Sequence, residues 1–279
     1  MSAAVRPARA EDLGSVSAAL RAAGLGANVG RLLEFPHSST AGEVLAAVDN
    51  GSVVGGAAVA RFGTTGWIGA LGVIGTGRRR GTGTALTEAA IDWLREHGAR
   101  TVLLYATEAG RPVYRRLGFD AEGEARAWRD VAPPAGGAPP AGVRALRPGD
   151  GDAVRALDSA ATGEDRGPVF DALGDLDTAA GLAIDRDGHL AGSALRSPWG
   201  LGPSVVAEDA GAGLALLSAL RRTRGGPLTV SLPDANAEAS NAMRAWGLRP
   251  INQATRMRLG PPPAYEPTRV FGMFNLFWG

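Results

Sequence analysis

The chain has 279 residues, of which 45% are hydrophobic and 20% are charged, and its formal net charge is only +1. This length indicates about two domains with room for packed cores, and the near-neutral charge argues against a nucleic-acid-binding or membrane-surface protein. The absence of cysteine excludes disulfides, cysteine-ligated zinc and a thiol nucleophile.

The N-terminal residues contain no apolar signal-peptide core, so we expect a cytoplasmic protein. Apolar spacing, turn residues and helix-end residues then predict strands and helices along the first half of the chain. In order they are a strand at Val5, a helix to Leu20, a helical or irregular segment Leu25–Phe35 ending before Pro36, and strands Glu43–Val48, Val53–Arg61 and Gly66–Val73. A helix Thr84–His97, a strand Thr101–Tyr105, a helix Gly110–Leu117 and a last strand opened by Gly118 and Phe119 follow. Asn50-Gly51 predicts a hairpin turn between the second and third strands.

A loop rich in glycine and arginine joins the strand that ends at Val73 to the next helix. Backbone N–H groups at a helix N-terminus have no intrahelical partners, and glycines let an anion approach them closely. Arg78, Arg79 and Arg80 add positive charge, so the loop predicts an anion site. It is not a P-loop, because the chain contains no lysine, and its glycine spacing does not fit the dinucleotide-binding fingerprint.

Two motifs here are similar to those of one superfamily. Arg78-x-x-Gly81-x-Gly83 matches R/Q-x-x-G-x-G/A, the pyrophosphate loop of the GNAT acyl-CoA N-acyltransferases, and Tyr114-x-x-Leu-Gly-Phe119 matches their Y-x-x-L-G-F. Residues Val5 to Asp130 therefore resemble a GNAT domain. The resemblance implies an α/β fold with a twisted mixed sheet flanked by helices, and transfer of an acyl group, most simply acetyl from acetyl-CoA, to an amine.

The same pattern returns in the second half of the chain, after a Pro/Gly/Ala linker at residues 131–142. The matching segments are Leu146-Arg147-Pro148 with Val5-Arg6-Pro7, Leu201-Gly202 with Leu71-Gly72, Gly211-x-Gly213 with Gly81-x-Gly83, Leu228–Pro233 with Thr101–Ala106, and Trp246-Gly247-Leu248 with Leu117-Gly118-Phe119. We predict two GNAT-like domains in tandem, at residues 1–130 and 143–279, as in a group of bacterial tandem-GNAT proteins that the chain resembles.

The second copy has lost the residues that bind and react. Glu208-Asp209-Ala210 stands where the first copy has Arg78 to Arg80, and carboxylates would repel a pyrophosphate. Met243 takes the position of Tyr114. We therefore predict a degenerate second domain with a structural or acceptor-binding role.

The resemblance implies a role for each matching residue of the first domain. Tyr114 is the expected general acid, since a tyrosine hydroxyl is protonated at neutral pH, and a backbone N–H near Val73 is the expected oxyanion donor. Thr107 stands where many GNAT proteins have an asparagine, which the second copy keeps as Asn236; we expect it to cap the helix that follows. The predicted acetyl-CoA-binding residues are Leu71, Val73, Arg78, Arg79, Arg80, Gly81, Thr82, Gly83, Thr84, Thr107 and Tyr114.

The general base is not fixed by the sequence. The strand that ends at Val73 has no carboxylate, so Glu34, Glu108 and Asp165 stay open as candidates, beside a water relay or an amine that arrives neutral. His37, His97 and His189 are scattered, and we assign them no catalytic role.

The expected partner is a small-molecule amine acceptor, with no nucleic acid, membrane or metal, in a monomer or homodimer. A non-catalytic CoA-binding or sensor protein, or a transferase with a longer or aminoacyl donor, are the alternatives. The apolar tail Thr268–Gly279 is much shorter than the ~20 residues of a membrane span. It predicts a capping strand or a plug at the domain seam in preference to a partner-binding patch.

Overall fold

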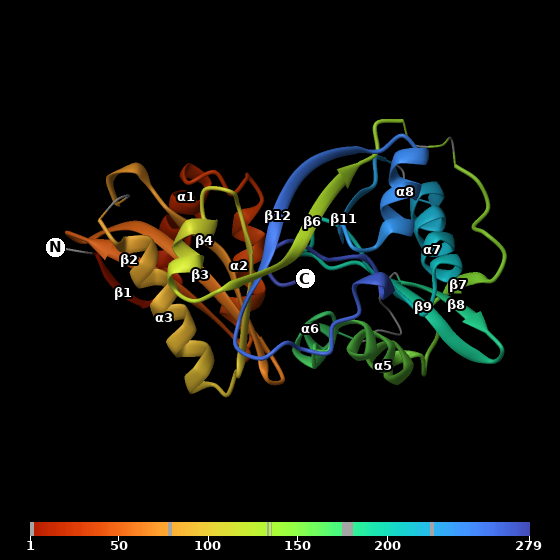
Figure 1. Ribbon diagram of the computed structural model, residues 1–279, viewed down its shortest axis with the longest axis horizontal. Helices are drawn as coiled ribbons and strands as arrows, with labels where there is room; N and C mark the ends of the chain where they lie inside the picture. The colour runs from red at the N-terminus through yellow and green to blue at the C-terminus, as the bar shows by residue number, and fades with distance from the viewer. Residues whose placement is uncertain (1–2, 78–79, 133, 135, 175–180, 224–225) are drawn as a thin grey trace. The chain divides into compact units, whose positions relative to one another are not determined.

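The computed structural model describes residues 3–77, 80–132, 134, 136–174, 181–223 and 226–279 (Figure 1). The chain forms two compact units. Unit 1 comprises Met1–Ala121, Met257–Pro261 and Trp278, and unit 2 comprises Glu122–Arg256, Pro262–Phe277 and Gly279. Each unit is a mixed sheet flanked by helices, in agreement with the fold class predicted from the sequence.

Unit 1 is built on a sheet in which β1 to β5 lie side by side in chain order, followed by the end of β12. Neighbours are antiparallel from β1 to β4, whereas β4 and β5 are parallel because helix α3 connects them. The elements are β1 (Ala4–Pro7), α1 (Leu13–Ala22), α2 (Val29–Ser38), β2 (Gly42–Asp49), β3 (Ser52–Phe62), β4 (Thr65–Val73), α3 (Thr82–Glu96), β5 (Thr101–Ala106) and α4 (Arg111–Arg116). Their order and type follow the prediction.

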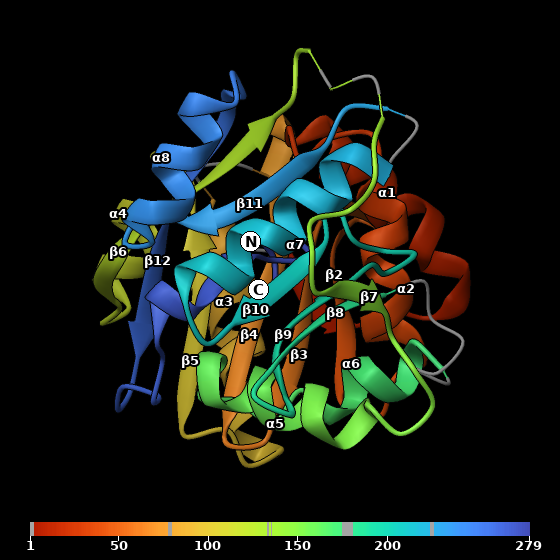
Figure 2. The ribbon, with the colours of Figure 1, turned by 90° about the vertical axis from the view of Figure 1, so that its right-hand side faces the viewer.

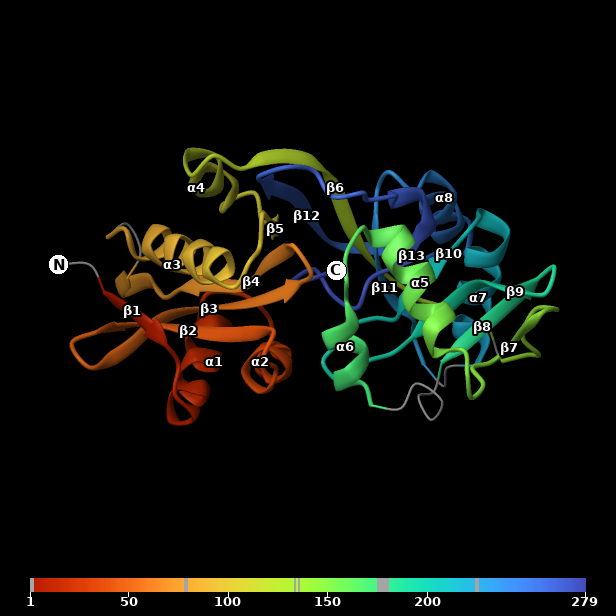
Figure 3. The same cartoon turned by 90° about the horizontal axis from the view of Figure 1, so that it is seen from below.

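Helices cover both faces of this sheet (Figure 3). Helix α3 packs on one face through Leu86 and Leu94, while α1 and α2 cover the other. Glycine permits the close approach of α1, because a Cβ on Gly72 would lie 2.9 Å from the Cβ of Ala23. The sheet of unit 1 therefore has a buried core on each side.

The predicted hairpin turn between β2 and β3 is confirmed. Asn50 and Gly51 have φ angles of 48° and 79°, and the flanking residues Asp49 and Ser52 pair directly. Two consecutive left-handed residues define the turn type that Asn-Gly favours.

The predicted end of the second helix is wrong, because α2 continues through Pro36 to Ser38. Proline removes only one N–H group here, and Ser39 still closes the last turn by donating to the Phe35 carbonyl at 3.0 Å. Pro36 is buried against β2, since a Cβ on Gly42 would lie 2.5 Å from the Pro36 Cα. Packing of the helix end outweighs the missing hydrogen bond.

Unit 2 repeats the element order of unit 1. Strands β13-β10-β9-β8-β7 form one sheet, β12-β6-β11 lie side by side, and α5 and α7 both pack on β9 and β10 (Figure 2). The elements are β6 (Asp120–Arg129), which enters unit 2 at Glu122, β7 (Val143–Ala145), α5 (Gly151–Thr162), α6 (Gly167–Ala172), β8 (Leu182–Arg186), β9 (His189–Leu195), β10 (Ser204–Ala207), α7 (Ala210–Thr223), β11 (Thr229–Pro233), α8 (Ala237–Ala245), β12 (Arg249–Leu259) and β13 (Val270–Gly272).

An arginine–aspartate pair links the first strand of unit 1 to its first helix. The Arg6 side chain donates to both carboxylate oxygens of Asp12, at 2.6 and 3.0 Å, and the backbone N–H of Arg9 donates to the same carboxylate at 2.8 Å. These three donors, the Arg6 side chain foremost, lower the pKa of Asp12 to about 2.

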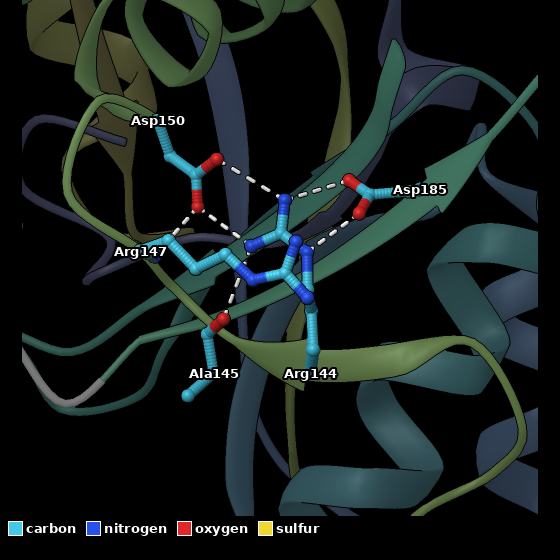
Figure 4. Close-up of polar contacts among 5 residues, drawn as sticks. All are labelled: Arg144, Ala145, Arg147, Asp150 and Asp185. Atoms are coloured by element: carbon cyan, nitrogen blue, oxygen red, sulfur yellow. Dashed lines mark hydrogen bonds and ion pairs between the residues drawn. The ribbon is translucent and has the colours of Figure 1, made fainter. Parts of the chain in front are cut away.

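Unit 2 contains the same arrangement (Figure 4). Arg144 donates to Asp150 at 2.6 and 3.1 Å, and the backbone N–H of Arg147 donates to Asp150 at 2.7 Å. Arg144 also binds Asp185, at 2.6 and 2.7 Å, and the two carboxylates raise its pKa. The counterpart of Arg6 is therefore Arg144, and the predicted match with Arg147 is wrong by three residues because the Arg-Pro pairs are out of register with this contact.

Candidate functional site

Strand β4 carries an extra residue near its end. Its register with β3 shifts by one residue at Ala70, whose φ of 47° lies in the left-handed region, so the strand forms a β-bulge. An extra residue reverses the alternation of side chains. As a result Leu71 and Val73 pack on the face covered by α3, together with Ile68.

The pairing of β4 with β5 ends just before this bulge. It runs from Thr65↔Thr101 to Ile68↔Leu104, although β4 continues to Val73 and β5 to Ala106. Leu71 and Val73, the predicted backbone contacts of the donor, therefore lie on the part of β4 beyond its β5 pairing.

Helix α3 follows this part of β4 after the connection of residues 74–81, and its N-terminus is uncapped. Gly81 stands before its first residue with a φ of 80°, and no side chain caps the helix. Its first intrahelical hydrogen bond runs from Ala85 to the Gly81 carbonyl at 2.9 Å. Within the described chain, nothing accepts from the N–H groups of residues 82–84, so these donors and the helix dipole suit an anion.

The arginines of the loop are described only in part. Arg78 and Arg79 lie outside the described residues. Arg80 pairs with Asp49 at 3.2 Å, and its side chain is 55% exposed. Exposed ion pairs contribute little to stability, so this pair offers little resistance to an anionic ligand that takes over the Arg80 guanidinium.

Tyr114 on α4 belongs to the core of unit 1. It is 9% exposed, and its ring meets Phe119 edge-on with the centroids 5.9 Å apart. Burial raises the pKa of its hydroxyl to about 12. The neutral hydroxyl is thus suited to donate a hydrogen bond to sulfur.

Thr107 shapes the turn before α4. Its hydroxyl accepts from the backbone N–H of Gly110 at 3.2 Å, and its carbonyl accepts from Arg111 at 3.0 Å. The N-cap residue itself is Gly110, which has no side chain to offer. Thr107 therefore stabilises the turn before α4, and its side chain does not cap the helix, contrary to the expectation.

The three candidate bases lie on different elements. Glu34 on α2 and Glu108 before α4 are exposed in unit 1. Asp165 belongs to unit 2, where it accepts from the backbone N–H of Gly167 at 3.1 Å. The histidines also lie on different elements: His37 is in the last turn of α2, His97 stacks on Trp93, and His189 pairs with Glu208 at 2.9 Å.

Unit 2 has a much shorter connection at the position of the glycine loop. Residues 74–81 separate β4 from α3, whereas only Glu208 and Asp209 separate β10 from α7. The predicted match of Leu201-Gly202 with Leu71-Gly72 is wrong for this reason: Leu201 precedes β10 in a turn. The connection between β10 and α7 is too short to surround a pyrophosphate.

A carboxylate of the chain also occupies the N-terminus of α7. Asp209 accepts from the backbone N–H of Ala212 at 3.0 Å and pairs with Arg186. Hydrogen bonds from the backbone, that of Ala212 foremost, lower the pKa of Asp209. Unit 2 thus supplies its own anion where unit 1 leaves the donors uncapped.

The C-terminal tail pairs with two strands of unit 2, β10 and β11. Strand β13 pairs with β10, the counterpart of β4, and Met273 bridges to Ser231 on β11. The side-chain amide of Asn236 donates to the carbonyls of Thr268 and Val270, at 3.1 and 3.0 Å. The predicted capping strand is confirmed as an element, since β13 spans Val270–Gly272.

Phe271 of the tail lies against the start of α7. A Cβ on Gly213, the counterpart of Gly83, would lie 2.4 Å from the Phe271 ring. The tail therefore contacts the unit 2 counterparts of β4, of the α3 N-terminus and of Thr107. The sequence analysis predicted neither this contact nor the bulge at Ala70. Gly213 and the apolar tail are visible in the sequence and hint at the contact, whereas an alanine at position 70 does not indicate a bulge.

No group of three or more His, Asp or Glu residues suited to a metal occurs in the described ranges. Among the described helices, none is both long and apolar enough to cross a membrane.

The bulged strand, the uncapped helix after it and the buried tyrosine on the next helix all lie in the segment that a family model covers. Residues 21–119 match the acetyltransferase (GNAT) family model and residues 154–272 match an acetyltransferase (GNAT) domain model. The chain belongs to the GNAT acetyltransferases and carries two such domains in tandem. No curated protein matches it.

Solved structures share this tandem fold. A putative acetyltransferase from Pyrococcus horikoshii is 21% identical with a TM-score of 0.85, and the match covers 100% of this chain and 96% of that one. A GCN5-related N-acetyltransferase from Sphaerobacter thermophilus is 20% identical with a TM-score of 0.63, over 94% and 98% of the two chains. A tandem GNAT protein from the clavulanic acid biosynthesis pathway is 18% identical with a TM-score of 0.58, over 93% and 99%.

Proposed function

We propose that unit 1 is an N-acyltransferase that moves an acetyl or similar acyl group from CoA directly to an amine of a small molecule. The observation that carries the proposal is the bulge at Ala70. It turns Leu71 and Val73 toward the face where α3 begins, on a part of β4 that lacks a β5 partner. The part of β4 without a β5 partner can form hydrogen bonds with an extended pantetheine arm of CoA. The uncapped N–H groups at the start of α3 can bind the CoA pyrophosphate.

In the proposed reaction the amine nitrogen attacks the thioester carbonyl carbon, and a backbone N–H near Val73 donates to the oxyanion that forms. Collapse of the intermediate breaks the carbon–sulfur bond and forms the amide. The proton lost by the nitrogen ends on the CoA thiol. Tyr114 donates a hydrogen bond to the departing sulfur, since its raised pKa keeps the hydroxyl neutral.

Unit 2 has no donor-binding role in this proposal. Its short connection, the Asp209 carboxylate and the bound tail each oppose acyl-CoA binding. We expect one acetyl-CoA per chain by isothermal titration calorimetry, with a rise in melting temperature. A ligand at 100 times its dissociation constant adds about 2.7 kcal/mol to the stability. No binding, or two equal sites, would overturn the proposal.

A non-catalytic CoA-binding protein is the second candidate. It is favoured by the absence of any carboxylate on β4, where a base would be expected. Acetyl-CoA with a broad amine panel separates the two: release of free thiol supports the transferase, and binding without thiol release supports the second candidate.

A further inference from the structure

Two aromatic side chains stack on the sheet of unit 1, on the face opposite α3. Trp67 of β4 and Tyr105 of β5 have their ring centroids 5.3 Å apart and their planes 23° from parallel. Their chain neighbours Ile68 and Leu104 belong to the core on the α3 side, and successive residues of a strand point to opposite faces. The aromatic pair therefore lies on the face that α1 and α2 cover.

Tyr105 stands where β4 and β5 separate. Leu104 is the last residue of β5 that pairs with β4, and Tyr105 is the next residue. Trp67 is fully buried and supports the ring of Tyr105, which is half-buried. Under the proposed function, the donor lies along the part of β4 that continues beyond this pairing, from Gly69 onward. Tyr105 thus places an aromatic ring beside the part of the sheet where acyl transfer takes place.

The surface around this position is apolar. Strands β4 and β5 contain no Asp, Glu, Arg or His. Leu25, which follows α1, covers the end of β4 on the same face, because a Cβ on Gly72 would lie 2.9 Å from the Leu25 Cδ1. The charged residues and the histidine of α1 and α2, the helices packed on this face, are all exposed: Arg21, Arg31, Glu34 and His37. These segments offer an acceptor aromatic and aliphatic contacts.

We propose that the acceptor is an arylamine, an amine bonded directly to an aromatic ring, and that Tyr105 stacks on that ring. The inference rests on the proposed function, because the position of Tyr105 is useful only where acyl transfer takes place. Aromatic rings attract one another beyond the effect of the area that they bury. An acceptor with a flat apolar body therefore fits Tyr105 and Leu25 better than a sugar or a polyamine.

An arylamine also explains why β4 can lack a carboxylate. An alkylamine has a pKa like that of lysine, about 10.4, so fewer than about one molecule in a thousand is neutral at neutral pH. It needs a base to remove a proton before it attacks. The nitrogen of an arylamine shares its lone pair with the ring and is already neutral.

In the reaction, the nitrogen lone pair of the arylamine forms the bond to the thioester carbonyl carbon. The electron pair of the carbon–sulfur bond leaves with sulfur, and the proton released by nitrogen ends on the CoA thiol. The products are an anilide and free CoA. No group of the protein has to take a proton from the acceptor before the attack.

The test measures thiol release from acetyl-CoA with three amines: aniline, benzylamine and cyclohexylamine. Aniline should have the highest kcat/KM at neutral pH, by about tenfold or more, because it alone is mostly neutral there. Its kcat/KM should change little between about pH 6 and 8, whereas the values for the two alkylamines should rise about tenfold per pH unit, with the neutral fraction.

Variants of Tyr105 test the stacking. Tyr105→Leu should raise the KM for aniline by about 3- to 10-fold and leave the KM for acetyl-CoA unchanged. Tyr105→Phe keeps the ring and should retain the wild-type KM for aniline. Trp93→Leu is the matched control, since it removes a half-buried aromatic side chain from α3, on the other face of the sheet, and should leave both KM values unchanged.

Faster transfer to cyclohexylamine than to aniline, or an unchanged KM for aniline in the Tyr105→Leu variant, would overturn the inference and leave the proposed function standing. Thiol release with none of the three amines would contradict the proposed function. Calorimetric titration of aniline into the protein with CoA present would then decide the aromatic site by itself. Binding that Tyr105→Leu weakens would support the site, and no binding would overturn it.

Discussion

The two units share one element order but treat the start of their central helix in opposite ways. In unit 1 a connection of residues 74–81 leads to an uncapped N-terminus. In unit 2 a connection of two residues places a carboxylate on the first turn of α7. Glycine is kept at Gly83 and at its counterpart Gly213, yet the two glycines face different neighbours.

The difference shows how two repeats keep one fold with different surroundings at the start of the central helix. Around Gly83 the nearest side-chain atom to an added Cβ would be 3.9 Å away, on Val73. Around Gly213 the Phe271 ring fills that space. The tail of unit 2 thus supplies the apolar contacts that an open site lacks, and its strand hydrogen bonds satisfy the edge of β10.

The largest expected effect comes from removing the tail anchor. Phe271 is fully buried, so Phe271→Ala should destabilise unit 2 by about 3–5 kcal/mol through lost burial and a cavity. Thermal unfolding with hydrogen exchange on α7 would measure it, and Ile251→Ala, at a position 54% exposed, is the control. Normal exchange on α7 in the Phe271 variant would show that the tail does not hold unit 2 closed.

The second comparison concerns Tyr114 and its counterpart Met243. Tyr114→Phe removes one hydrogen bond to a developing negative charge, so kcat should fall by about 10- to 100-fold while acetyl-CoA affinity is kept. Met243→Leu conserves volume in a fully buried position and should leave turnover unchanged. Steady-state rates and calorimetry on both variants decide the point; equal turnover would remove Tyr114 from the mechanism.

The third comparison replaces Gly83 and its counterpart Gly213 by alanine, one at a time. Gly213→Ala would force a Cβ against Phe271 and should cost about 1–3 kcal/mol. Gly83→Ala would add only an ordinary contact, 3.9 Å from Val73, and gains helix propensity, so unit 1 should be as stable or more so, but with weaker acetyl-CoA binding. Melting temperatures and titrations of the pair test this. If Gly213→Ala is as stable as the wild type, the tail is not seated as described.

The smallest expected effect is a response to acid. The pKa of Asp12 is lowered from its usual 3.8 to about 2, so its contribution to stability is present above about pH 4 and is lost as the pH falls toward 2. Asp12→Asn should flatten the acid unfolding curve in this window. Asp152→Asn, which alters a carboxylate without a described ion pair, is the control and should keep the wild-type slope.

Much of the fold was predictable because local signals agree with it. Asn50-Gly51 specified a turn, and the glycine after α3 ended the helix at the expected place. The repeat was found from glycine spacing and from Leu117-Gly118-Phe119, whose counterpart Trp246-Gly247-Leu248 forms the same helix end, with φ angles of 88° and 78° at the two glycines.

The candidate site was predictable only where a motif marks it. Gly81 and Tyr114 belong to motifs, whereas Ala70 takes up its left-handed φ because of strand pairing, which no residue type announces. The contact of Phe271 with Gly213 joins residues distant in sequence, so spacing carries no trace of it. Arg147 was matched with Arg6 because both precede a proline. The contacts with Asp150 show that Arg144 is the counterpart of Arg6, and a shared Arg-Pro pair does not reveal such an ion pair.

The length of the connection before α7 also bears on how the chain evolves. A point substitution exchanges a side chain, but it does not lengthen the two-residue segment Glu208–Asp209. Recovery of a second working domain would need an insertion, loss of the capping carboxylate and release of the tail, each unfavourable without the others. Under the proposed function, unit 2 therefore serves as a scaffold, and single substitutions would not give it a donor site.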